Sequence, residues 1–320
     1  MRAFARDEPF FRGLAVTVGL FALLKGFQFP SLYLATEAQL NYNHGLIKRG
    51  LLGALFHALH APINHYAVFA VIALGIFALC VTALVLFIWR TGLWMRSSGL
   101  LVAIVFLSSY AVTFASDNIG RADIIFLLIT LVVTLIDNVF LRSAALTILG
   151  IAATFIHEMF ALTVFGACLA PSLLQLLEQK NLKGLLLHLA LVAAPIAATA
   201  IAVFIVSWKA SFTPELAQQV HHEIVDNIDF PAEGKPWALL QRGMSANFER
   251  MLEVDKSSTF ATRWLVNLFI FLPATAFLLW ACNCFLDAAK QPRKRLALLL
   301  MCGVALAPLA MNLLATDTYR

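Results

Sequence analysis

The chain of 320 residues is 61% hydrophobic and only 13% charged, and its formal net charge is +5. Its mean hydropathy of +0.84 reflects more apolar surface than one soluble core can bury, which excludes an ordinary soluble domain. We expect no nucleic-acid partner. The five cysteines lie inside or beside apolar runs, a pattern that indicates neither a disulfide framework nor a metal cluster. We predict an all-α, polytopic membrane protein with a single multi-pass domain over residues 1–320.

Nine segments are apolar and long enough to be considered as membrane helices in a window of about 19 residues. The first continues through residues 13–34 without a small-residue cleavage pattern, which predicts a retained helix rather than a signal peptide. The weakest, 143–156, would cover only roughly 21 Å of a hydrocarbon core about 30 Å thick. In chain order the predicted spans are 13–34, 66–89, 98–115, 122–140, 143–156, 159–177, 184–207, 264–285 and 296–314.

The charges of the loops predict that the N-terminus is cytoplasmic. With nine spans, the segments on the N-terminal side carry most of the lysines and arginines outside the long loop, including "KQPRKR" at 290–295. Merging 143–156 with 159–177 would move this basic cluster to the outside, so the two spans are kept separate. The expected location is the bacterial cytoplasmic (inner) membrane, with a first outer loop at 35–65 and a large periplasmic loop at 208–263.

The outer motif "SDNIGRAD" (116–123) joins the third and fourth predicted spans and contains Asp117, Arg121 and Asp123. A functional site would use these three groups together. A solvated turn is the alternative, because Gly120 permits a positive φ and Asp123 would lie in the first turn of the next helix, where the helix dipole favours an acid.

The motif "HE", His157 and Glu158, joins the fifth and sixth predicted spans. Because the preceding span is short, we expect this pair below the outer surface, on the floor of a polar cavity, since an ionisable pair at that depth is costly without a partner. A pair that only staples two helices is the alternative. Lys25, in the middle of the first predicted span, is expected either to pair with an acid or to reach the cavity.

Two further polar motifs lie on the outer side. Lys48 and Arg49 in "IKRG" suit either a phosphate ligand or anionic membrane headgroups. His221, Glu223 and Asp226 in "HHEIVD" have a suggestive spacing, but a polar surface is the favoured interpretation over a metal site.

Acids, a histidine and cations on one side of a membrane suit the transfer of a sugar from a polyprenyl phosphate. Cations would hold the phosphate leaving group, and a carboxylate would remove the proton from the attacking hydroxyl. The candidate catalytic residues are Glu37, Asp117, Asp123, His157 and Glu158. The candidate phosphate-binding or substrate-binding residues are Tyr42, His44, Lys48, Arg49, Arg121, Asp317 and Arg320.

This layout resembles the GT-C superfamily of integral membrane glycosyltransferases. The resemblance rests on Glu37 in "ATEAQL" directly after the first span, and on "IKRGLLGALFHALH" (47–60), where Leu51, Leu55 and Leu59 recur at helical spacing. It implies a catalytic carboxylate at Glu37, an amphipathic surface helix, a polyprenyl-phosphate-linked sugar as donor and a saccharide or lipid acceptor. Family members often have adjacent acids in this loop, whereas Glu37 stands alone, so the need for a divalent cation stays open and Asp117 is the alternative base or metal ligand.

Three other interpretations stay open. The chain also resembles O-antigen polymerase-like proteins, whose large late outer loop would here carry Arg242, Arg250 and Arg263. A secondary transporter would use a broken helix at the "HE" motif as its binding site, and a scaffold protein would use the large loop. The ending "ATDTYR" resembles the other charged outer motifs, so we expect further helices beyond Arg320.

Overall fold

The computed structural model describes residues 8–233 except 48, 96, 109 and 210–211. This part of the chain is helical and contains no β-strand, so the predicted all-α class is confirmed for it. A short 3₁₀ helix covers Leu93–Met95. The α-helices are α1 Glu8–Gly26, α2 Leu32–Glu37, α3 Leu51–Ala58, α4 Tyr66–Arg90, α5 Ser97–Ser108, α6 Tyr110–Asp117, α7 Ala122–Thr134, α8 Val139–Ile156, α9 Phe160–Thr163, α10 Phe165–Glu178, α11 Leu182–Lys209 and α12 Pro214–Asn227.

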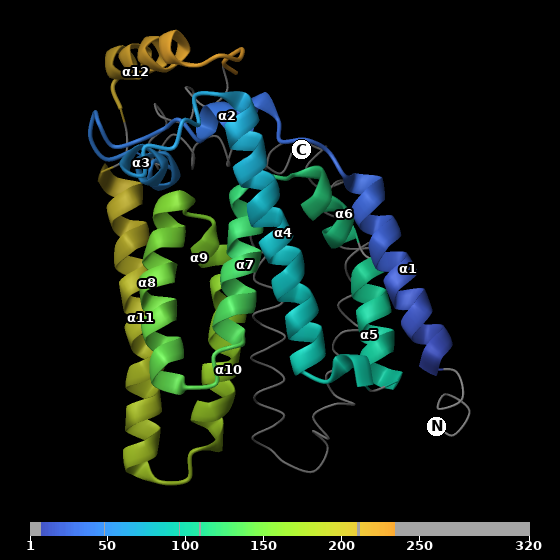
Figure 1. The fold of residues 1–320 in the computed structure, drawn as a ribbon. Coiled ribbons are helices and arrows are strands. Elements are labelled where there is room, and N and C mark those ends of the chain that lie inside the picture. Colours follow the sequence, from blue (N-terminus) through green and yellow to red (C-terminus); the bar gives the residue numbers. More distant parts are fainter. Residues whose placement is uncertain (1–7, 48, 96, 109, 210–211, 234–320) are drawn as a thin grey trace, which may run out of the picture.

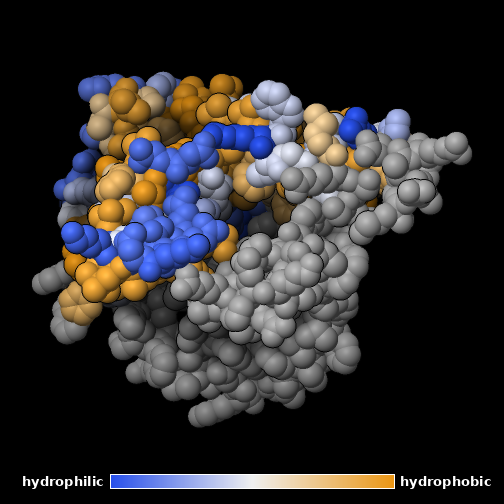
Figure 2. All heavy atoms as spheres, turned by 90° about the horizontal axis from the view of Figure 1, so that it is seen from below, coloured by the Kyte–Doolittle hydropathy of each residue, from blue (hydrophilic) through white to orange (hydrophobic). Residues whose placement is uncertain are grey.

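The long helices lie side by side and share two ends (Figure 1). The upper end consists of α2, α3, α12, the α6–α7 turn and the link between α8 and α9. The lower end consists of the turns that follow α4, α7 and α10. Figure 2 looks onto the lower end and shows hydrophilic side chains gathered between hydrophobic ones. Exposed polar residues here include Arg90, Asp137, Asn138, Lys180 and Lys183.

Four described helices are long and apolar enough to cross a membrane: α1, α4, α8 and α11. Two further apolar helices, α7 and α10, are shorter. The prediction of nine spans is not confirmed, because 98–115 is divided between α5 and α6, and 264–285 and 296–314 lie outside the described residues.

Two predicted helix boundaries are wrong. The helix predicted at 143–156 begins at Val139, because the side chain of Asn138 accepts hydrogen bonds from the backbone N–H groups of Phe140 and Leu141, at 3.0 and 3.1 Å. With 18 residues it reaches about 27 Å, so it is not a short helix. The first helix ends at Gly26 rather than at residue 34. Lys25 is therefore an exposed residue in its last turn instead of a charge in mid-span.

Polar contacts support the packing of α8 against α11. Pro195 lies inside α11 and has no N–H to donate, which leaves the carbonyl of Leu191 without its helical partner. Ser143 Oγ from α8 donates to this carbonyl oxygen at 2.6 Å. Further along the interface, a Cβ added to Gly150 would come within 2.8 Å of Thr199 Oγ1. Small side chains thus allow these two helices to approach closely.

Residues 212–233, which include α12, dock on the loop between α2 and α4. His44 Nε2 lies 2.6 Å from Glu223 Oε2, and the backbone N–H of Glu233 donates to Thr36 Oγ1 at 3.2 Å. Beneath these contacts, apolar side chains of both segments form one buried cluster that includes Leu40, Ile47, Phe212, Val220 and Ile224. The late segment therefore fixes the early loop from which the site is built.

Candidate functional site

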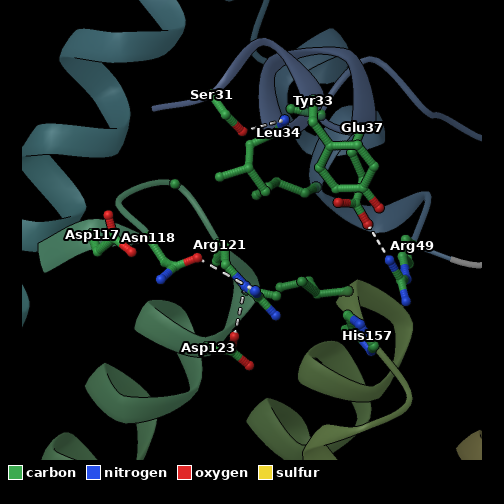
Figure 3. A pocket seen from close by; sticks show the side chains of 15 residues that line it. Ser31, Tyr33, Leu34, Glu37, Arg49, Asp117, Asn118, Arg121, Asp123 and His157 are labelled. Atoms are coloured by element: carbon green, nitrogen blue, oxygen red, sulfur yellow. Dashed lines mark hydrogen bonds and ion pairs between the residues drawn. The ribbon is translucent and has the colours of Figure 1, made fainter. Parts of the chain in front are cut away.

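A cavity of about 450 Å³ opens at the upper end of the helices. It is bounded by α2, the residues before α3, the α6–α7 turn and the end of α8 (Figure 3). The structure thus brings four predicted catalytic residues and two predicted cations into one cavity. The polar side chains that line it are Ser31, Tyr33, Glu37, Arg49, Asp117, Asn118, Arg121, Asp123 and His157.

The α2 wall of the cavity carries Tyr33 and Glu37. Ser31 begins this helix, because its side chain accepts from the backbone N–H of Leu34 at 3.4 Å. Residues four apart lie on one helix face, so Tyr33 and Glu37 both face the cavity (Figure 3). Tyr33 was not among the predicted site residues, although its i,i+4 relation to Glu37 was the available signal.

Arg49 holds the Glu37 carboxylate. Arg49 Nη1 donates to Glu37 Oε1 at 2.7 Å, and the two side chains are only 11% and 17% exposed. Burial alone would lower the pKa of Arg49, but the nearby Glu37, Glu158 and Tyr33 outweigh it and raise that pKa, so the guanidinium stays charged. Its backbone φ of +62° is unusual for a residue with a side chain. The chain thus accepts a strained backbone where it delivers this cation.

A glycine lets α3 bring Arg49 to α2. A Cβ added to Gly53 would lie 2.1 Å from the carbonyl oxygen of Leu40, so only glycine fits between α3 and the loop after α2. The predicted surface helix at 47–60 is shorter in the structure, Leu51–Ala58. Leu55 is 47% exposed and Leu59, directly after the helix, is 75% exposed, so this segment presents an apolar surface beside the cavity.

The second cation comes from the turn between α6 and α7. Arg121 Nε lies 2.9 Å from Asp123 Oδ2, and Arg121 Nη1 donates to Asn118 Oδ1 at 3.4 Å. Gly120 has a φ of +94° and makes this turn possible. Asp123 lies in the first turn of α7, as the turn interpretation predicted. Asp117, at the end of α6, lines the cavity and is exposed.

His157 forms part of the cavity where α8 ends. The backbone N–H of Met159 donates to His157 Nδ1 at 3.2 Å, and Glu158 Oε2 lies 3.6 Å from the same nitrogen. The ring packs at 85° against Phe126 with ring centroids 6.4 Å apart. Burial, reinforced by the charge of Arg49, lowers the pKa of His157 from 6.5 to about 3. The imidazole is therefore neutral at pH 7.

This low pKa predicts a loss of stability in mild acid. Between pH 6.5 and 3 the unfolded chain binds a proton at His157 that the folded chain excludes. Above pH 6.5 His157 is neutral in both the folded and the unfolded chain, so its burial carries no cost of excluding a proton. As the pH drops below 6.5, proton binding stabilises the unfolded chain, and the free energy of unfolding falls by up to about 1.4 kcal/mol per pH unit. Denaturation in detergent between pH 7.5 and 4.5 should show a steeper loss for the wild type than for His157→Gln. Parallel curves would contradict a neutral buried His157.

Several predicted site residues lie elsewhere. Tyr42 and His44 do not line the cavity, because α12 covers their loop: His44 pairs with Glu223, and Tyr42 packs against the cluster of Leu40 and Ile47. Burial raises the pKa of Tyr42 to about 12. Glu158 contacts His157 through Oε2 but does not line the cavity. The remaining predicted residues, Lys48, Asp317 and Arg320, are outside the described residues.

The "HHEIVD" motif lies on α12 and contributes to docking through Glu223. Within residues 8–233, apart from the gaps noted above, no three histidine, cysteine, aspartate or glutamate side chains are grouped so that they could hold a metal ion. The acids of the cavity come from three different elements, α2, α6 and α7.

The apolar helices and the polar cavity at one of their ends define a helical membrane protein. Residues 11–247 match the family model described as "Uncharacterised membrane protein Rv1490", and the chain belongs to that family. Neither the curated proteins nor the solved structures contain a match to the chain. The family description gives membrane association and names no activity.

Proposed function

We propose that the protein is a membrane glycosyltransferase that moves a sugar from a polyprenyl-phosphate-linked donor to a saccharide or lipid acceptor. The reaction would occur at the upper end, facing the outside of a bacterial inner membrane, in the assembly of a surface polysaccharide or glycolipid. The observation that carries the proposal is the cavity in which Glu37, Arg49, Arg121 and Asp123 are held in two ion pairs beside apolar helices.

This arrangement suits the charges that change during transfer. The acceptor oxygen forms a bond to the anomeric carbon, the bond from that carbon to the phosphate oxygen breaks, and the lipid phosphate leaves with the electron pair. Preorganised cations stabilise the developing charge of the leaving group, and we assign this role to Arg121 and Arg49. The acceptor proton passes to a carboxylate, for which Glu37 is the preferred group.

The contact with Arg49 fixes the Glu37 carboxylate at the cavity wall through Oε1. Asp117 is the alternative base, because it lines the same cavity from the opposite side (Figure 3). Asp123 has an orienting role through its contact with Arg121.

The proposal predicts a large effect of Arg121→Ala on transfer. Removal of a charge-assisted contact worth about 1.5–3 kcal/mol should lower the use of donor roughly 10- to 100-fold. The assay uses purified protein in liposomes with a radiolabelled polyprenyl-phosphate sugar and quantifies the glycosyl product. The matched control is Arg90→Ala, which removes an exposed arginine that pairs with Asp137 at the lower end.

Two outcomes of this assay would contradict the proposal. Equal losses of folded protein and of product in Arg121→Ala would indicate a structural role for the turn. Movement of a sugar or an ion across the liposome membrane, without a glycosyl product, would favour a secondary transporter.

Orientation is tested separately with single cysteines at the two ends. Gln219 on α12 and Lys180 after α10 are both exposed, and they lie at the upper and lower ends. In intact cells, Gln219→Cys should react with an impermeant thiol reagent and Lys180→Cys should react only after the membrane is opened. The parent protein without these substitutions gives the background labelling. The reverse pattern would place the cavity in the cytoplasm and remove the proposed donor from its reach.

A further inference from the structure

We infer that neutral His157 donates a hydrogen bond from Nε2 to a phosphate oxygen of the lipid-linked donor. The inference rests on the proposed function and adds a binding residue to it. In this role His157 selects the phosphate without acting as acid or base.

The backbone around His157 sets the tautomer of its ring. Met159 N lies 3.2 Å from His157 Nδ1, and a backbone N–H can only donate, so Nδ1 must be the acceptor. A neutral imidazole carries one N–H, which is then on Nε2. Glu158 Oε2, at 3.6 Å from Nδ1, is too distant to hold a competing hydrogen on that nitrogen.

The Nε2–H group is available to a ligand. The ring lines the cavity and lies below Glu37 and Arg49 in Figure 3. Among the residues that the structure describes, the contacts of the ring are those of Nδ1 and the packing against Phe126, and none involves Nε2. The His157 side chain is only 16% exposed, so its N–H donor needs an acceptor, and a ligand in the cavity can supply one.

The charges around the ring favour an anionic acceptor over a sugar hydroxyl. Arg49 and Arg121 both act on the ring and disfavour its protonation, while Glu158 opposes them. Burial is the main cause that keeps the imidazole neutral, and the two arginines add to it. Their positive potential also attracts an oxygen with negative charge to the adjacent space. The neutral N–H of His157 adds a hydrogen bond to the phosphate beside the two arginines. It adds no third positive charge, which would bind the released lipid phosphate too tightly.

Two amide substitutions test which ring nitrogen matters. The Nε2 amide of glutamine can reach the position of His157 Nε2, whereas the shorter asparagine can only replace Nδ1. With farnesyl phosphate as the probe, His157→Gln should bind within about 3-fold of the wild type and His157→Asn about 10-fold more weakly, the loss of one hydrogen bond to a charged group. Farnesol, which has no phosphate, should bind all three proteins equally.

Nitrogen NMR of histidine-labelled wild-type protein provides a measurement that does not depend on a variant. At pH 7 we expect an unprotonated Nδ1 and a protonated Nε2 whose signal shifts with farnesyl phosphate and not with farnesol. A protonated Nδ1, or equal affinity of the wild type and His157→Asn for farnesyl phosphate, would overturn this inference alone. A wild type that does not prefer farnesyl phosphate to farnesol would overturn the proposed function as well.

Discussion

Arg49→Ala is expected to lower the free energy of unfolding by about 3–5 kcal/mol and to abolish transfer. Arg49 and Glu37 are both largely buried and in contact at 2.7 Å, and Glu158 also acts on the same guanidinium. Loss of the cation leaves the Glu37 carboxylate in a partly desolvated site without the arginine that pairs with it. Alanine keeps the left-handed backbone strain of position 49, so the change reports on the side chain.

A double-mutant cycle isolates the ion pair from other effects of Arg49→Ala. In a Glu37→Gln background the same substitution should cost at least 1 kcal/mol less, because the partner charge is already absent. Stability is followed by denaturant-induced unfolding in a fixed detergent. Arg90→Ala, which breaks an exposed pair, should change stability by no more than about 1 kcal/mol. Equal costs of Arg49→Ala in both backgrounds would show that Glu37 is not its energetic partner.

The loops between successive membrane helices fall alternately at the two ends of the bundle. The order of the helices therefore predicted that the charged loops gather at one end. The first loop, the α6–α7 turn and the link after α8 all fall at the upper end, which places Glu37, Arg121 and His157 within one cavity. That inference needs the helices only in order, and their exact lengths matter little. It therefore survives the incorrect ends predicted for the first and fifth spans.

The predicted span began at residue 143 rather than at Val139, where α8 begins, because Arg142 interrupts the apolar run in a hydropathy window. Arg142 is 3% exposed and lies within the helix, since its Nε donates to Ser172 Oγ at 3.0 Å and its Nη1 to the carbonyl of Ile136 at 3.2 Å. Gln175 accepts a further hydrogen bond from Nη2. These two partners on α10 lie 30 and 33 residues further along the chain and make the buried charge tolerable, and no local pattern reveals them.

Tyr42 and His44 lie outside the cavity for a related reason. Their loop was expected to face the substrate, but α12 returns from far along the chain and covers it with apolar contacts and the Glu223 pair. Tyr33 shows the opposite case. It lies four residues before Glu37 on a short helix, so its place in the cavity was predictable once that helix was recognised.

The two ion pairs of the cavity differ in how exposed they are, and therefore in how easily their arginines can rearrange to contact a ligand. The Arg49–Glu37 pair is buried and ties α2 to the residues before α3, whereas Arg121 and Asp123 are about a third and nearly half exposed, at 34% and 45%. Exposed pairs rearrange at little cost. Under the proposed function, Arg121 would therefore turn toward the phosphate of the donor, while Arg49 keeps the Glu37 carboxylate in place. This division predicts that mutations of Arg121 affect transfer more than folding and that mutations of Arg49 affect both.

Glu37→Gln is expected to lower transfer by about 10²- to 10⁴-fold while leaving the affinity for the donor nearly unchanged. The amide keeps the size of the side chain and can still accept from Arg49 through its carbonyl oxygen, but it cannot take the proton of the acceptor. The affinity for a polyprenyl-phosphate sugar, measured without acceptor, gives the binding control. A parallel loss of donor affinity would instead assign Glu37 to binding.

Two further carboxamide variants decide which acid is the base. Asp123→Asn should reduce transfer less than about 10-fold, because its carboxylate orients Arg121 at 2.9 Å and an amide oxygen can keep that contact. Asp117→Asn should also be mild, since its exposed carboxylate is solvated rather than held at the cavity wall by a cation. The measurement is single-turnover transfer with saturating donor. Wild-type activity in Glu37→Gln with none in Asp117→Asn would move the base to the end of α6. Activity in both variants would remove the catalytic role of these acids, because no transferred proton would then pass through either carboxylate.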